Sequence, residues 1–140
     1  MQASAIAPDA ELIGHAQQLQ AELERRSGEI DQLRQLPQDL AEKLATLGFY
    51  RLVVPEHLGG LGTSPDTFCE ICETLAMANG STAWCVFIGA TSQYLFGALP
   101  PSQLKKMLAN PNVITSGVFA DSGTACAESR DGVAGYRING

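Results

Sequence analysis

Residues 83–96 limit most strongly how this chain can fold. They read AWCVFIGATSQYLF and contain no charged residue. A helix that is apolar on nearly every side is buried inside a domain. This one is also too short, and too polar around residues 91–93, to cross a bilayer. We therefore expect a central helix with the other helices packed around it.

A second helical pattern precedes this stretch and ends at a polar break over residues 78–82. Ser64 is expected to be its N-cap, and Pro65 takes the first helical position, where a missing N–H costs nothing. Apolar residues then recur at helical spacing, which predicts one buried face. These residues are Phe68, Ile71, Cys72, Leu75 and Ala76.

Two more helices are predicted before residue 50. From Asp9 onward, steps of three or four residues, or multiples of them, separate the apolar residues of one long amphipathic helix. These are Leu12, Ala16, Leu19, Leu23, Ile30 and Leu33. Pro37 starts the next helix, which carries Leu40, Leu44 and Leu47 on one face. Gly48 supplies the left-handed residue that often ends a helix, with Phe49 packing back. Residues 49–54 should then form a short extended segment.

The last third of the chain changes from a helical period to a strand period. A final short helix opens at residues 99–102, with Leu104, Met107 and Leu108 facing inward, and Asn110-Pro111 ends it. Residues 113–120 and 136–138 are predicted to be strands, separated by a connection rich in Gly, Ser and Asp.

The predicted strand at residues 136–138 runs into Asn139-Gly140, a strong hairpin signal. Two short strands make only a marginal sheet. We therefore expect a helical domain over residues 1–111 and the incomplete start of a β-domain over residues 112–140.

Composition excludes some classes of partner. The chain has 140 residues, about one domain, and a formal net charge of -6. A nucleic-acid partner would need a basic surface, which this chain lacks. The N-terminus has no basic region followed by an apolar run, so no secretory signal is expected and the chain should stay in the cytoplasm.

The residue types that bind metals or act in catalysis do not form a convincing site. Four cysteines in such a chain are expected to be reduced thiols. Cys69 and Cys72 have C-x-x-C spacing, but they lie within a predicted helix without a second such pair, so no metal site is expected. His57 lies in a glycine-rich loop that lacks the P-loop ending, and we interpret it as a solvent-exposed histidine.

Several ordered motifs resemble the acyl-CoA dehydrogenase superfamily. They are LGFYRLVVPEHLGGLG between the second and third helices, GSTAW at the start of the fourth, then GVFADSGTA and GYRING. The resemblance spans about residues 9–140. It implies a mainly α fold, with the five-helix orthogonal-type bundle of the N-terminal domain followed by the first strands of a truncated β-domain. In that family a flavin lies between the middle and C-terminal domains, and the enzymes are homo-oligomers, usually tetramers.

Two branches of this superfamily remain open. Dehydrogenases acting on acyl-CoA with FAD usually carry Thr-Glu-Pro and then Gly-Ser-Asp at the first middle-domain strand, whereas this chain has ADSGTA over residues 120–125. The GSTAW motif and the Phe-Ala-x-Ser-Gly pattern at residues 119–123 are more similar to flavin-dependent monooxygenases. Those enzymes take reduced flavin from a separate reductase and use O2 to hydroxylate aromatic or related substrates. A third hypothesis is that the chain is a non-catalytic helical interaction module.

The resemblance also implies roles for particular residues. Six of them would lie along the flavin, FAD or FMN: Phe119, Ala120, Asp121, Ser122, Gly123 and Thr124. Trp84, Phe87 and Thr91 match positions that line the far end of the substrate pocket, although the two aromatic residues could equally be core. The family's catalytic groups come from later parts of the chain, so no catalytic residue is assigned here. The isolated chain is expected to bind flavin weakly or not at all, and to be inactive.

Overall fold

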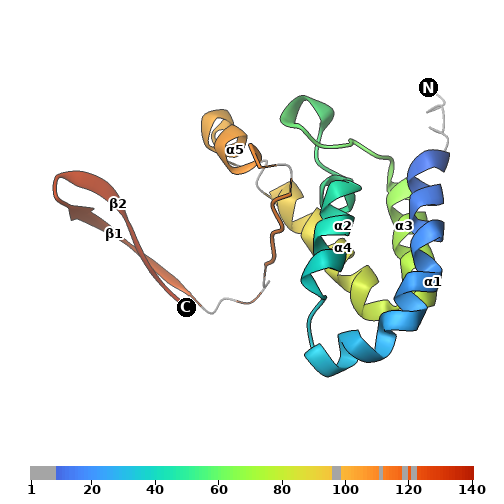
Figure 1. Ribbon diagram of the computed structural model, residues 1–140. Helices are drawn as coiled ribbons and strands as arrows, with labels where there is room; N and C mark the ends of the chain where they lie inside the picture. The colour runs from blue at the N-terminus through green and yellow to red at the C-terminus, as the bar shows by residue number, and fades with distance from the viewer. Residues whose placement is uncertain (1–8, 96–98, 111, 118–119, 121–122) are drawn as a thin grey trace.

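The computed structural model describes residues 9–95, 99–110, 112–117, 120 and 123–140 (Figure 1). Five α-helices are followed by two strands: α1 (Ala10–Leu33), α2 (Gln38–Thr46), α3 (Pro65–Ala78), α4 (Gly80–Leu95), α5 (Pro101–Met107), β1 (Thr124–Arg130) and β2 (Val133–Asn139). Two 3-10 helices, η1 (Phe49–Arg51) and η2 (Glu56–Leu58), lie between α2 and α3. The expected fold class, mainly helical with strands at the end, is confirmed. No described helix is long and apolar enough to span a membrane.

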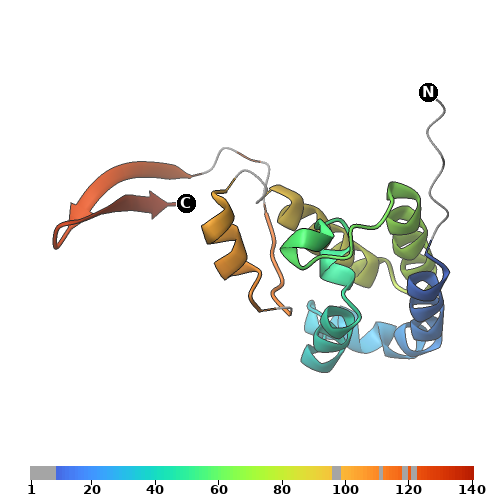
Figure 2. The same ribbon diagram turned by 90° about the horizontal axis from the view of Figure 1, so that it is seen from above.

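The core lies between α1, α3, α4 and the α2–η1 segment. Helices α1 and α3 lie side by side (Figure 2), and α3 also packs on α4. The short helix η1 contacts both α4 and α2. The largest fully buried side chains include Leu23, Leu40, Leu44, Phe49, Tyr50, Leu52, Ile71, Leu75 and Val86. Burying a large apolar side chain of this kind contributes roughly 1.5–3 kcal/mol.

Local chemistry sets the helix ends largely as expected. The Asp9 carboxylate accepts hydrogen bonds from the backbone N–H groups of Glu11 and Leu12 at the start of α1. The Ser64 hydroxyl accepts from the N–H of Thr67, and Pro65 is the first residue of α3. Gly48 has a left-handed φ of 79° after α2.

Some residues predicted to face the core do not. Leu33, at the end of α1, is 49% exposed. At the start of the same helix the predicted Leu12 is only partly buried, and Ile13 beside it is buried instead. Ala76 on α3 and Met107 on α5 are exposed, and Cys72 is only partly buried. The helical period identifies the buried face of each helix correctly. Which residues at the edge of that face are buried depends on how far the neighbouring helix extends.

The segment 49–54 is not extended, and the prediction of a strand-like stretch there is wrong. The N–H of Arg51 donates to the carbonyl of Gly48 at 2.8 Å, which forms a 3-10 turn directly after α2. The following loop folds back onto this turn, with the N–H of Gly62 donating to the Val54 carbonyl at 2.8 Å. A Cβ at Gly60 would lie 2.0 Å from that carbonyl oxygen, so only glycine fits.

The strands also differ from the prediction. Residues 113–117 form no strand and lie along α4, where the Gln93 side chain donates to the Val113 carbonyl at 3.0 Å. Residues 118 and 119 lie outside the described part of the chain. The predicted strand at 136–138 is confirmed within β2, but its partner β1 occupies the expected connection.

The turn between the strands is Asp131-Gly132, with φ of 53° and 79°. Positive φ at both central residues is the chemistry of a tight hairpin turn. The hairpin signal at Asn139-Gly140 follows β2 and stays a prediction. Strand β1 reads TACAESR and is exposed throughout, which explains why it shows no apolar alternation.

An ion cluster joins α1 to α2. The Arg26 guanidinium lies 2.6 Å from Asp39, 2.8 Å from Glu29 and 3.3 Å from Glu22. Lys43 lies 2.6 Å from Glu22. Hydrogen bonds from Arg26 lower the pKa of the Asp39 and Glu29 carboxyls, so these groups stay ionised into mildly acidic solution.

Asn79 forms the corner between α3 and α4. Its backbone N–H donates to the Leu75 carbonyl at 2.9 Å, which closes α3. Its side-chain oxygen accepts from the N–H of Thr82 at 2.8 Å and from the Thr82 hydroxyl at 2.9 Å, which caps α4. Its side-chain nitrogen donates to the Ser27 hydroxyl on α1 at 3.0 Å. One side chain, 7% exposed, therefore connects three helices.

Gly89 marks the closest approach of α4 to η1. A Cβ at this position would lie 2.4 Å from Cδ1 of Tyr50, a fully buried ring. Burial raises the pKa of Tyr50 to about 12, with a smaller effect from Cys85. Because the ring is fully buried, the absence of a side chain at Gly89 determines how closely the two elements pack.

We predict that Asn79→Ala lowers the free energy of unfolding by about 2 kcal/mol, because the cap is lost and the buried N–H of Thr82 has no acceptor. Asn79→Asp keeps the cap oxygen and loses only the donor to Ser27, so it should cost less than half as much. Urea denaturation followed by circular dichroism measures both. An Asn79→Ala variant as stable as the wild type would contradict this role.

We predict that Gly89→Ala destabilises the fold by about 1–3 kcal/mol, because the methyl group overpacks against Tyr50. Alanine is a better helix former than glycine by about 1 kcal/mol. The matched control is Gly14→Ala on α1, where an added Cβ meets nothing within 4 Å. That variant should be neutral or slightly stabilised in the same denaturation assay, and equal effects at the two sites would refute the packing argument.

Candidate functional site

One face of α4 is open to solvent and carries the residues expected to line a substrate pocket. Trp84 is 63% exposed and Phe87 is 40% exposed, and Thr91 is partly buried one turn further on. The opposite face, including Val86 and Ala90, is fully buried. The expectation that this helix is enclosed on all sides is therefore wrong for the described chain. The core reading of Trp84 and Phe87 is wrong as well.

The two exposed aromatic side chains belong to a row that starts in the core. The rings of Phe68 on α3 and Phe87 on α4 have centroids 5.6 Å apart, and Phe87 stacks with Trp84 at 5.8 Å and 18°. Such pairs contribute about 0.5–1.5 kcal/mol beyond their buried area. The buried Phe68 thus supports the exposed Trp84 through Phe87.

The polar Thr91 side chain is accommodated in this helix by a hydrogen bond to the backbone. Its hydroxyl donates to the Phe87 carbonyl one turn earlier at 2.7 Å. The donor is therefore already used within the helix, and the hydroxyl oxygen remains as an acceptor toward the open side.

Two hollows lie on either side of Trp84. The first, which we call the α3–α4 groove, has a volume of about 350 Å³. It is lined by Cys72, Glu73, Ala76, Gly80, Ala83, Trp84 and Phe87. The second, the α1–α4 groove, has a volume of about 480 Å³, and its lining includes Ile30, Asp31, Arg34, Leu36, Trp84 and Cys85. Trp84 lines both grooves.

The thiols near these grooves are poor nucleophiles at neutral pH. Burial raises the pKa of Cys72 to about 11, with a smaller contribution from Cys69, and burial also raises the pKa of Cys85. A protonated thiol is a weak nucleophile and a weak metal ligand. All four cysteines are free, and no cluster of potential metal ligands occurs among the residues that the structure describes.

Of the six residues expected along a flavin, three are described. Ala120 is exposed, Gly123 directly precedes the hairpin, and Thr124 is the first residue of β1, paired with Asn139. A Cβ at Gly123 would lie 3.2 Å from the Asn139 carbonyl oxygen, so this position favours glycine. Phe119, Asp121 and Ser122 lie outside the described residues.

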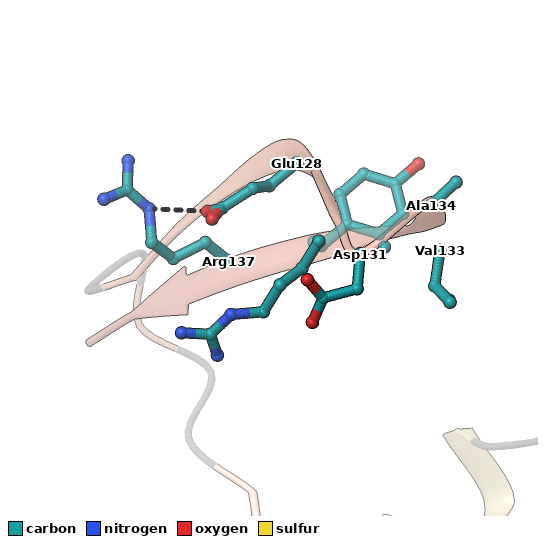
Figure 3. Close-up of a pocket in the computed structure, with 8 residues that line it drawn as sticks. Glu128, Asp131, Val133, Ala134 and Arg137 are labelled. Atoms are coloured by element: carbon teal, nitrogen blue, oxygen red, sulfur yellow. Dashed lines mark ion pairs between the residues drawn. The ribbon is translucent and has the colours of Figure 1, made fainter.

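A further hollow of about 530 Å³ lies against the hairpin (Figure 3). Glu128 and Arg137, which both line it, form an ion pair at 3.3 Å, and Asp131 in the turn and Val133 directly after it also line it. Every residue of both strands is exposed. Without an enclosing wall in the described chain, this surface is not a candidate site.

The sequence interpretation missed the α3 side of the α3–α4 groove. Cys72 and Ala76 were predicted to face the core, and Glu73 was assigned no role. Cys72 and Glu73 are consecutive residues and Ala76 lies about one turn further along α3, and all three line the groove with Trp84. In the sequence, Ala76 is a small residue of the apolar stripe and Glu73 is a carboxylate beside it. Only the position of α4 shows that both line a groove.

Comparison with curated proteins finds relatives that carry oxygenase names. The chain is 42% identical over 92 residues to an indole-3-acetate monooxygenase of Acinetobacter baumannii, covering 65% of this chain and 23% of that protein. It is 35% identical over 117 residues to an indole-3-acetate monooxygenase of Pseudomonas putida, covering 82% and 28%. It is 30% identical over 119 residues to the oxygenase subunit HsaA of a flavin-dependent monooxygenase of Rhodococcus jostii, covering 84% and 30%.

The chain thus spans between about a quarter and a third of the length of these curated relatives. A family model describing the N-terminal domain of acyl-CoA dehydrogenases matches residues 15–109, which run from α1 to the end of the helical region. This match covers well over half of the chain and agrees with the observed order of helices. The chain therefore belongs to the acyl-CoA dehydrogenase family, of which it contains the N-terminal domain.

Proposed function

We propose that this chain is the N-terminal portion of a flavin-dependent monooxygenase, the oxygenase component of a two-component system. The observation that carries the proposal is the similarity to proteins named as oxygenases of ring compounds. Besides the indole-3-acetate monooxygenases, the chain is 29% identical over 138 residues to the oxygenase component of an FADH(2)-dependent resorcinol hydroxylase of a Rhizobium strain. The names "oxygenase subunit" and "oxygenase component" support a separate flavin reductase as partner.

A flavin, FAD or FMN, is the cofactor of the proposed enzyme, and when reduced it supplies the electrons that activate O2. The residues present are compatible with it. Ala120, Gly123 and Thr124 are small and uncharged, and Thr124 adds an exposed hydroxyl group. We propose that residues 119–124 lie along the polar edge of the flavin ring, with the Ser122 hydroxyl contributing.

Trp84, Phe87 and Thr91 would form one wall of the substrate pocket. The open aromatic face supports this assignment, because a large exposed apolar surface on a helix usually marks a binding surface. Stacking on Trp84 and Phe87 favours a flat aromatic substrate. The chain's part in the reaction is then to bind and orient the ring and to exclude water, while the catalytic groups lie elsewhere in the protein.

The second candidate function is α,β-dehydrogenation of an acyl-CoA, which the family model favours by its description. The sequence ADSGTA at residues 120–125 departs from the dehydrogenase pattern, so we rank it lower. A non-catalytic interaction module has no supporting observation in the comparisons. We further propose a boundary between helical and β-domains near residue 111, a homo-oligomeric enzyme and a cytoplasmic location.

The test uses the full-length enzyme that contains this domain, supplied with chemically reduced FAD or FMN. We expect O2-dependent hydroxylation of indole-3-acetate or resorcinol, with labelled oxygen from ¹⁸O2 in the product. Trp84→Ala should lower kcat/KM about ten-fold through loss of one stacking surface. The control is Met77→Ala, which removes an exposed apolar side chain from α3 and should leave kcat/KM unchanged. Oxidation of an acyl-CoA with an artificial electron acceptor, without oxygen incorporation, would instead establish the dehydrogenase.

A further inference from the structure

The α3–α4 groove has the size and composition of a small-molecule site. Its volume of about 350 Å³ is in the range of ligand pockets, roughly 300–1,000 Å³. One wall consists of the stacked rings of Trp84 and Phe87, and the small residues Ala76 on α3 and Ala83 on α4 leave space beside them. This combination fits the flat face of an aromatic ring.

Glu73 makes the groove chemically asymmetric. It is the one charged residue among the described residues that line it. Its carboxylate forms no ion pair or hydrogen bond within the described part of the chain, whereas the acidic residues Glu22, Glu29 and Asp39 on α1 and α2 are paired. An ionised carboxylate accepts hydrogen bonds and donates none. A ligand can satisfy Glu73 only with an N–H or O–H donor or a positive charge.

We propose that the α3–α4 groove receives the ring of an aromatic substrate and that Glu73 determines which end of that ring enters. This inference rests on the proposed function and names a residue that selects its substrate. A ring edge bearing an N–H or O–H group is directed toward Glu73, and a ligand carboxylate is directed away from it. An aromatic acid therefore binds ring first, with its acid group facing out of the groove.

Electrostatics support this orientation. Two negative charges about 4 Å apart repel by roughly 1 kcal/mol in water and by more where water is partly excluded. Trp84, Phe87 and Ala83, on the α4 side of the groove, carry no charge that would offset this repulsion. The chain's net charge of -6 acts in the same direction. A carboxylate placed beside Glu73 is thus the least favourable arrangement.

The experiment uses Trp84 itself as the reporter, because it is the sole tryptophan of the 140 residues. Benzylamine, benzyl alcohol and benzoate carry the same ring with positive, neutral and negative substituents. None of them absorbs at the red edge of tryptophan absorption, so quenching of Trp84 fluorescence reports binding directly. We expect affinity to fall in the order benzylamine, benzyl alcohol, benzoate at low ionic strength.

Glu73→Gln keeps the shape of the side chain and removes its charge, so it should reduce the preference for benzylamine over benzoate by about two- to five-fold, the range of an exposed ion pair. The matched control, Glu70→Gln, removes the same charge from the same helix at an exposed position outside the groove lining. It should leave the preference unchanged. Circular dichroism verifies that both variants are folded.

Two results would overturn the inference. An unchanged preference in Glu73→Gln would show that Glu73 does not select the ring, and no quenching by any of the three compounds at millimolar concentration would show that the groove does not take a ring. Both readouts are independent of oxygen chemistry. If the full-length enzyme hydroxylates its substrate but Glu73→Gln leaves the preference unchanged, the role of Glu73 is refuted and the proposed function stands. If the full-length enzyme is an acyl-CoA dehydrogenase and the charge preference is still observed, only the proposed function is refuted.

Discussion

The arrangement of this molecule depends on the hydrogen bonds of Asn79. Because its side chain caps α4 while its backbone closes α3, the two helices meet at a fixed corner. The bond to Ser27 ties that corner to α1. Glu73 precedes the corner and Trp84 follows it, so the groove between them exists only while the corner holds. A buried amide with each of its polar atoms bonded is well suited to this role, since an unpaired one would be costly.

Helix α4 is divided along its length into a structural face and an open face. Gly89 permits close contact with the Tyr50 ring, and Val86 and Ala90 complete the buried side. The other side presents Trp84 and Phe87 to solvent, supported from below by Phe68. Leaving two aromatic rings exposed forgoes the stabilisation that their burial would provide, roughly 1.5–3 kcal/mol for a fully buried phenylalanine. A binding role gives a physical reason for that arrangement.

Family membership and proposed chemistry rest on different observations. The match over residues 15–109 concerns the helical domain alone. The oxygenase proposal rests on the named relatives and on the departure from the dehydrogenase pattern at residues 120–125. In either case the part that we propose for this domain is to provide walls, orientation and charge selection, because a flavin carries its own redox chemistry.

The sequence by itself determined the helices, several of their ends and the family. Asp9, Ser64 and Gly48 act through hydrogen bonds and dihedral angles within a few residues, so their effect is readable locally. Only the tertiary structure decided that residues 49–54 form a turn, that β1 pairs with β2 through Asp131-Gly132, and that Trp84 is open to solvent. Exposure is a property of what packs against a residue. An apolar side chain in the core and one lining a groove have the same local pattern, and the neighbouring helix distinguishes them.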